Sequence, residues 1–318
     1  MRAPRADFLR RLATAVAFAL AALALRADET PGQGTLVEES CASAALGHAL
    51  GFLVYLPAGY DAAPARTYPT LYLLHGRGDS MQAWRQAKPL LDALIADGKI
   101  PPLIAVMPDA PSSRRAGYYV DSQFAGTDQL PAGEAVETAL TRDLIAHVDR
   151  TYRTRAERDG RAVAGYSMGG YGAARFAFAH PELFASAIVL SPALYEPLPP
   201  VDSSARTFGA FGRGAARFDE AIYRDLAAPW LDVKNDERLP LRLFIAVGDD
   251  EPIRDATGES LTTDAVRFHQ HCRRHPQVEA QLRVLDGGHD WKVWRAGLAA
   301  GFEWCWSVAR VQANETQR

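Results

Sequence analysis

Cysteine is scarce in this chain of 318 residues, and neither sign of charge dominates it. The three cysteines, Cys41, Cys272 and Cys305, do not have the spacing of a metal site. The net charge is only −3, so the chain lacks the excess of positive charge that attracts nucleic acid or an anionic membrane surface. Internal repeats are also absent, and the length suits a single large α/β domain.

Long apolar runs are absent from all but the first residues. The basic segment MRAPRADFLRR precedes the run LATAVAFALAALAL, which is short for a membrane span of about 20 residues. Small residues at Ala24 and Ala27 then offer a cleavage site. We therefore predict a signal peptide over residues 1–27, no stable membrane insertion after its removal, and a periplasmic or extracellular mature protein. An uncleaved anchor is the alternative.

Secretion bears on the state of the cysteines. An oxidising compartment permits one disulfide among the three and leaves one thiol over. The sequence does not choose among the three pairings, and buried free thiols are an equally good interpretation.

Apolar segments with strand character alternate with segments of helical spacing in the rest of the chain. We expect strands at residues 49–56, 67–74, 103–107, 161–166, 185–190, 241–247 and 278–285. We expect helices at residues 90–96, 134–152, 171–179, 262–273 and 291–311. Continuous apolar strands separated by helices predict an α/β fold with a mostly parallel central sheet and helices on both faces. Residues 28–318 would form this single domain.

Residues 192–240 interrupt the alternation. This segment is rich in proline, glycine and aromatic residues. A long insertion of this kind is more often a cap or a binding loop than a spacer. We expect it to shape a substrate pocket.

The stretch AGYSMGGYG contains a G-x-S-x-G pattern centred on Ser167. An expected strand ends just before this serine and a helix is expected just after it, which is the setting of a nucleophile elbow. Gly165 and Gly169 flank the turn, where larger side chains would clash. A glycine-rich turn without catalytic function is the alternative.

A catalytic serine needs a base, and His289 is the best candidate downstream. It lies in DGGHDW, after the last expected strand, where open α/β sheets place their chemistry. His180 suits a helix end. His271 and His275 could share a helix face as metal ligands, but neighbouring arginines and the lack of an acidic ligand favour a solvated helix end.

The sequence leaves the third member of the triad open. The segment GDDEP after the preceding strand supplies Asp249, Asp250 and Glu251, and at most one of them can face the histidine. Its task would be to fix the imidazole tautomer and to stabilise the imidazolium. The N–H of Met168 would be one oxyanion donor, and the HGRG loop that starts at His75 would supply the other.

The chain resembles a family of α/β-hydrolases known as putative esterases, which includes esterase D, feruloyl esterases and the mycolyltransferases. The resemblance is carried by YPTLYLLHGRGDSMQAW, YYVDS, the stretch around SMGGYGA, VGDDEPI and GGHDWKVW. It extends from about residue 49 to the last expected helix and implies the α/β-hydrolase fold.

The resemblance also implies roles for individual residues. Ser167 would be the nucleophile, His289 the base, and the N–H groups of Arg77 and Met168 the oxyanion hole. Members usually carry aspartate at the third position after the glycine, where this chain has Glu251. We favour Glu251 as the acid because position in the loop aims the carboxylate, and Asp250 is the alternative.

These residues predict a secreted serine esterase that acts through an acyl-enzyme, without a metal or an organic cofactor. Its partner would be a small-molecule or polysaccharide-linked ester, with no nucleic acid involved. An acyltransferase with the same triad is the first alternative, and a non-catalytic binding module on the same fold is the second. Trp84 would either line the site or belong to the core.

Overall fold

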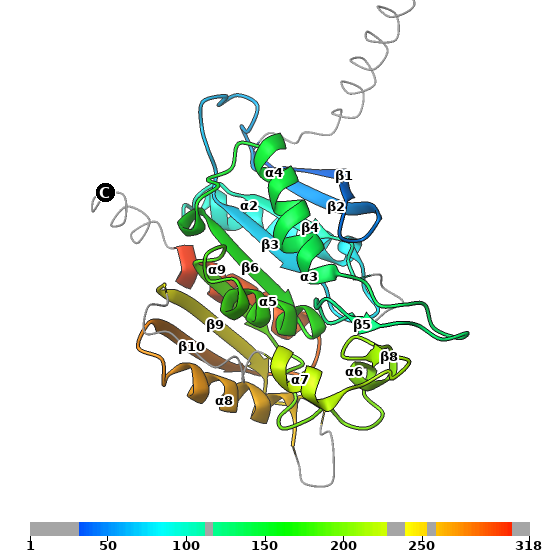
Figure 1. Cartoon of the computed structure of the whole chain (residues 1–318). Helices are drawn as coiled ribbons and strands as arrows, with labels where there is room; N and C mark the ends of the chain where they lie inside the picture. The colour runs from blue at the N-terminus through cyan, green and yellow to red at the C-terminus, as the bar shows by residue number, and fades with distance from the viewer. Residues whose placement is uncertain (1–31, 112–116, 228–238, 253–258, 307–318) are drawn as a thin grey trace, which may run out of the picture.

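The structure, a computed structural model, describes residues 32–111, 117–227, 239–252 and 259–306 (Figure 1). The predicted signal peptide lies outside these residues. The main sheet of the described residues has eight strands in the order β1-β2-β4-β3-β6-β7-β9-β10. These strands are β1 (Thr35–Ser43), β2 (His48–Leu56), β3 (Thr70–Leu74), β4 (Ile104–Pro108), β6 (Arg161–Tyr166), β7 (Ser186–Leu190), β9 (Leu241–Gly248) and β10 (Val278–Leu285).

Most of this sheet is parallel. Strands β4, β3, β6, β7, β9 and β10 run in one direction, whereas β2 pairs antiparallel with both β4 and β1. Strand β1 was not expected from the sequence. Its only fully buried side chains are Cys41 and Ser43, so it lacks the continuous apolar run that marked the central strands.

Helices cover both faces of the sheet, as predicted (Figure 1). They are η1 (Met81–Ala87), α2 (Lys88–Ala96), α3 (Val136–Thr138), the π-helical η2 (Ala139–Leu144), α4 (Ile145–Thr151), η3 (Arg158–Gly160), α5 (Met168–Ala179), α6 (Ser204–Thr207), α7 (Glu220–Leu226), α8 (Leu261–Cys272) and α9 (Trp291–Trp306). Helix α9 ends at the limit of the described residues, so the last residues of the helix predicted over 291–311 lie outside them.

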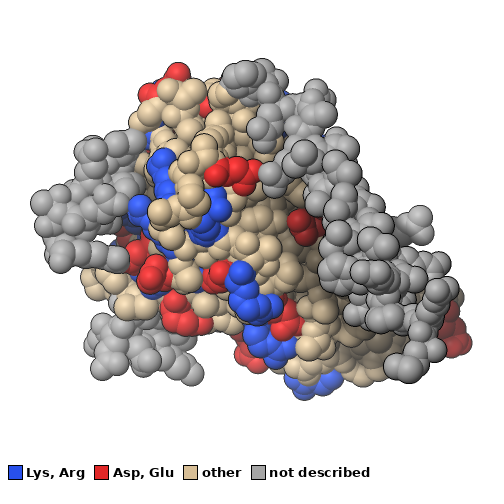
Figure 2. Space-filling view, turned by 90° about the horizontal axis from the view of Figure 1, so that it is seen from above, with Lys and Arg blue, Asp and Glu red and all other residues tan. Residues whose placement is uncertain are grey.

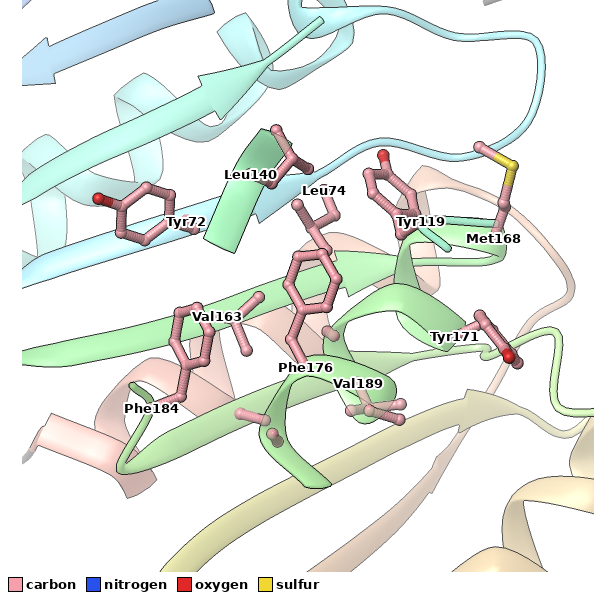
Figure 3. Close-up of a cluster of buried hydrophobic side chains, with 14 of the residues drawn as sticks. Tyr72, Leu74, Tyr119, Leu140, Val163, Met168, Tyr171, Phe176, Phe184 and Val189 are labelled. Atoms are coloured by element: carbon pink, nitrogen blue, oxygen red, sulfur yellow. The ribbon is translucent and has the colours of Figure 1, made fainter. Parts of the chain in front are cut away.

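Two hydrophobic clusters fill the space between helices and sheet. The first packs α3, η2, α4, α5 and α8 on one face, and the second packs η1, α2 and α9 on the other. Figure 3 shows part of the first cluster, where Phe176 of α5 lies beside Val163 of β6 and stacks on Phe184. Alternate residues of the central strands enter opposite clusters, because successive side chains of a strand point to opposite faces.

The insertion, residues 192–240, carries α6, α7 and the two-residue strand β8 (Arg213–Gly214) in its described part. β8 pairs with β5 (Gln123–Phe124), which lies outside the main sheet. Tyr223 of α7 is buried and packs on Phe211 with ring centroids 4.9 Å apart. Both side chains belong to the first hydrophobic cluster, so the described part of the insertion packs onto the rest of the domain.

The cysteines make no crosslink. Cys41, Cys272 and Cys305 are all described and buried, and no disulfide joins any two of them. Burial raises the pKa of Cys41 and of Cys272, which keeps both thiols protonated and unreactive at neutral pH. The sequence left open either one disulfide or buried free thiols, and the structure has buried thiols.

The described surface mixes both signs of charge. Figure 2 shows basic and acidic side chains interspersed on one face of the molecule, in keeping with the net charge of −3. Within the described residues, no helix combines the length and the hydropathy needed to cross a bilayer.

A buried ion pair links α5 to α3. Arg175 of α5 donates to both carboxylate oxygens of Glu137, over 2.7 and 3.1 Å, and His180 lies 2.8 Å from the same carboxylate. Arg175 also donates to the carbonyl of Leu226 at the end of α7. Burial alone would raise the pKa of Glu137, but the hydrogen bonds and charges of His180 and Arg175 outweigh it and hold that pKa below its ordinary value.

We expect Arg175→Met to lower the free energy of unfolding by about 3 kcal/mol, because it leaves the Glu137 carboxylate buried without its main partner. Urea denaturation at neutral pH measures this change. The lowered pKa of Glu137 makes the contribution of the pair present at neutral pH and lost as the pH falls through that pKa. Variant and parent should therefore converge in acid.

The exposed pair between Arg224 and Glu220 is the matched control. Arg224→Met should change the free energy of unfolding by less than about 0.5 kcal/mol, because solvent screens exposed pairs. Equal losses in Arg175→Met and Arg224→Met would contradict the importance of the buried pair.

Candidate active site

Ser167 stands at the turn between β6 and α5. Its φ of 57° and ψ of −120° put a non-glycine residue in a strained backbone region. Its N–H donates to the carbonyl of Leu190, and its own carbonyl accepts from the N–H groups of Tyr171 and Ala193. The surrounding backbone therefore holds the strained turn, and the half-buried side chain lies at the C-terminal edge of the sheet.

The glycines of the G-x-S-x-G pattern are required by close backbone contacts. A Cβ atom on Gly165 would lie 2.2 Å from the carbonyl oxygen of Gly169, and one on Gly169 would lie 2.1 Å from that of Leu74. Neither backbone could accept a side chain without moving. Strand β6, the turn and the neighbouring strand β3 therefore approach as closely as the elbow interpretation expects.

Two loops meet at the ends of β9 and β10. The N–H of Asp250 donates to the carbonyl of Gly287, and the N–H of Gly287 donates to Oδ1 of Asp249. A Cβ on Gly248 would lie 2.1 Å from the oxygen of Gly287. These contacts hold the segment that carries Glu251 against the segment that carries the downstream histidine.

Three side chains from these turns form one chain of hydrogen bonds. Nδ1 of His289 lies 2.7 Å from Oε2 of Glu251, and Nε2 of His289 lies 2.9 Å from Oγ of Ser167. A carboxylate only accepts, so Nδ1 carries a hydrogen, and Nε2 of the neutral ring is left to accept from the serine hydroxyl. The Glu251 side chain is 0% exposed and that of His289 is 26% exposed.

The adjacent carboxylates point elsewhere. Asp249 binds the N–H of Gly287, and Asp250 is exposed and uses its backbone rather than its side chain in the loop contact. The second oxygen of Glu251 accepts from the N–H of Gly248 at 3.4 Å. Of the three acids that the sequence left open, Glu251 is the one that the structure places against His289.

The backbone N–H groups expected to form an oxyanion hole lie at the ends of β3 and β6. Met168 is the first residue of α5, and the first N–H groups of a helix have no partner within it. Its side chain is buried in the first cluster (Figure 3), so only its backbone is available. Within the described residues, no hydrogen bond uses the N–H of Arg77, whose side chain is exposed.

A group of packed aromatic side chains, here called the aromatic platform, lies against the ring of His289. It was not predicted from the sequence. It comprises Trp84, Tyr166, Trp291 and Trp294. Tyr166 stacks on Trp294 with ring centroids 4.3 Å apart, and the ring of His289 stands perpendicular to Trp294 at 5.1 Å. Trp84 is 0% exposed, so it belongs to the core. The spacing of Trp291 and Trp294 at the start of a helix was the available signal.

The platform also reaches the loop after β3. The hydroxyl of Tyr166 donates to Oδ2 of Asp79 over 2.6 Å. Burial, with the bond to Asp79, raises the pKa of Tyr166, so the hydroxyl stays a donor. Tyr166, the residue before the serine, therefore connects the aromatic packing around His289 to the loop that carries Arg77.

The other downstream histidines take no part in this arrangement. His180 pairs with Glu137. His271 and His275 lie against each other at the end of α8, with their Nε2 atoms 3.4 Å apart. Within the described residues, no group of three or more histidine, cysteine, aspartate or glutamate side chains is arranged to hold a metal ion.

Comparison with known proteins gives related sequences along most of the chain. The family profile described as "Putative esterase" matches residues 43–305. The "Endo-1,4-beta-xylanase/feruloyl esterase" of Xylanibacter ruminicola is 34% identical over 181 residues, which are 55% of this chain and 24% of that protein. Esterase Rv1288 of Mycobacterium tuberculosis is 40% identical over 147 residues, 46% of this chain and 29% of that one. The matches thus span less than a third of the length of these two relatives.

Among solved structures, a ferulic acid esterase superposes with a TM-score of 0.67 at 26% sequence identity. The superposition covers 86% of this chain and 97% of that one. The α/β-hydrolase fold and the family that the sequence motifs indicated are thereby confirmed.

Proposed function

The chain belongs to the family described as "Putative esterase", and from this premise we propose that it is a serine hydrolase of carboxylic esters with a covalent acyl-enzyme intermediate. The observation that carries the proposal is the hydrogen-bond chain from Glu251 through His289 to Ser167. It joins an acid, a base and a nucleophile in the order that acyl transfer requires.

The proposed reaction begins at Oγ of Ser167. Nε2 of His289 takes the serine proton as Oγ attacks the ester carbonyl, and Glu251 holds the ring in the required tautomer and stabilises the imidazolium. The N–H groups of Arg77 and Met168 would donate to the oxyanion. His289 then protonates the leaving alcohol, and an acyl-Ser167 ester remains. Water next attacks the acyl carbonyl while His289 takes a proton from it. His289 returns this proton to Oγ of Ser167 as the free acid is released.

The proposed substrates are small-molecule or polysaccharide-linked esters, with feruloyl esters among them. The support is the name of the 34% identical relative from Xylanibacter ruminicola and of the superposed ferulic acid esterase. The insertion, residues 192–240, supplies α6 and α7, which lie past the C-terminal ends of β6 and β7 (Figure 1). We further propose that residues 1–27 direct secretion, on the basis of their basic and apolar segments.

An acid quench tests the covalent step. After mixing with p-nitrophenyl acetate or methyl ferulate, the intact mass should increase by one acyl group, and peptide mapping should place that group on Ser167. Heat-denatured protein is the control for nonspecific acylation. The proposal would be contradicted if the ester is turned over but no acyl adduct is found after the quench, and if a Ser167 variant keeps the normal rate.

The same reaction mixture separates hydrolysis from transfer. With glycerol or a sugar present, a hydrolase should release mainly the free acid. Dominant formation of the transfer ester in water would instead assign the chain as an acyltransferase, which uses the same three residues. Absence of both products with p-nitrophenyl acetate and with methyl ferulate would favour a non-catalytic binding module.

A further inference from the structure

His75, the residue directly after β3, has a fully buried side chain that the proposed reaction does not use. Its exposed fraction is 0%. Nδ1 of its ring lies 2.9 Å from the carbonyl oxygen of Gly76. Because a carbonyl oxygen can only accept, Nδ1 carries a hydrogen and donates it to Gly76.

The opposite side of the ring makes no such contact. Nε2 of His75 has no hydrogen-bond partner within the described residues. Burial lowers the pKa of His75, against smaller opposing effects of the Gly76 carbonyl, Asp109, Asp79 and the Pro111 carbonyl. The ring is therefore neutral at ordinary pH, with a lone pair on Nε2. The bond from Nδ1 to the Gly76 carbonyl is the hydrogen bond of this ring that meets full geometric criteria within the described residues.

The carbonyl that His75 holds belongs to the peptide that carries the N–H of Arg77. This peptide unit is planar, with its C=O and N–H pointing in opposite directions. The direction of the Gly76 carbonyl therefore sets the direction of the Arg77 N–H. The N–H of Asp79 donates to the same oxygen over 3.2 Å, so two donors fix one acceptor.

The neighbouring backbone is fixed as well. The hydroxyl of Tyr119 donates to the carbonyl of His75 over 2.8 Å. Gly76 packs directly on the Tyr166 ring, where an added Cβ would lie 2.5 Å from a ring carbon. Three contacts thus fix the peptide between Gly76 and Arg77. Tyr119 holds the preceding carbonyl, His75 holds the carbonyl of the peptide itself, and the Tyr166 ring packs against Gly76.

We propose that His75 is a positioning residue of the oxyanion hole, whose Nδ1–H holds the Gly76 carbonyl and so aims the Arg77 N–H at the oxyanion of the reaction. The inference rests on the proposed function, because it gives the Arg77 N–H its role. His75 itself touches neither substrate nor Ser167. It acts by removing the freedom of one peptide plane, so the donor needs no reorganisation when charge develops.

Three variants separate the hydrogen bond from the filling of space. His75→Asn keeps a nitrogen donor attached to Cγ, the place of Nδ1. His75→Gln moves its nitrogen one bond further along the side chain, and His75→Leu has no donor. We would measure kcat and KM for p-nitrophenyl acetate, the inhibition constant of an aryl trifluoromethyl ketone, and the melting temperature. The ketone places an oxyanion in the hole when it adds to a catalytic serine.

Loss of a whole oxyanion donor costs about 10²–10³ in kcat, and a misaimed donor should cost part of that. We expect His75→Leu and His75→Gln to lower kcat by about 10- to 100-fold and to weaken ketone binding in parallel, with little change in KM. His75→Asn should recover most of both. A role in packing alone would lower the melting temperature without this rescue.

Three outcomes would overturn the inference. One is wild-type kcat and ketone affinity in His75→Leu and His75→Gln. Another is an equal loss in the Asn and Gln variants, which also decides the case if the Leu variant does not fold. The third is full activity in a parallel Ser167→Ala variant, which overturns the proposed function together with the inference. The first two outcomes with an inactive Ser167→Ala overturn the inference alone.

Discussion

Replacement of Ser167 by alanine is expected to lower kcat for p-nitrophenyl acetate by about 10⁶-fold, the size of the loss when a triad serine is removed. The variant lacks the Oγ that lies 2.9 Å from Nε2 of His289, so no acyl-enzyme can form. The fold should persist, because the backbone bonds of residue 167 with Leu190, Tyr171 and Ala193 do not involve the side chain. Initial rates and a thermal melt measure the two effects.

Ser191 is the matched control for this substitution. It follows β7, the neighbouring strand, and it is a fully buried serine with a positive φ of 39°. Its Oγ has no hydrogen-bond partner within the described residues. Ser191→Ala should therefore keep a kcat close to that of the parent. Substantial activity in Ser167→Ala, or an equal loss in both alanine variants, would refute Ser167 as the nucleophile.

The second large effect is expected at the acid. Glu251→Gln should lower kcat by about 10³- to 10⁴-fold, because an amide can no longer stabilise the imidazolium and can present N–H groups to Nδ1 of His289. The change is nearly isosteric, so the fully buried side chain should still fit. Steady-state kinetics at neutral pH, with a thermal melt, measure this loss.

Asp250→Asn is the paired test, since the sequence alone left Asp250 as the alternative acid. Its side chain is exposed, and its contact with Gly287 is made by the backbone. We expect kcat to stay near the parent value. A large loss in Asp250→Asn combined with a normal rate in Glu251→Gln would reverse the assignment of the acid.

Much of the architecture follows from patterns that the chain carries locally. Central strands such as β6 and β9 are buried on both faces and read as continuous apolar runs, which is why they were predicted. Strand β1 was missed because a half-exposed edge strand gains its definition from pairing with β2. The short elements of the insertion were missed for a similar reason, because they are stabilised by contacts with distant segments rather than by periodicity.

The sequence by itself determined the parallel sheet, the elbow around Ser167 and the candidacy of His289, because each depends on a local pattern and on its place after a strand. Only the tertiary structure decided which carboxylate faces the histidine. Asp249, Asp250 and Glu251 are adjacent and chemically alike, and their directions are set by the backbone contacts of one loop with Gly287. The same holds for His75, whose partner is a neighbouring carbonyl but whose significance comes from the Arg77 N–H and from the strand β6 that packs beside it.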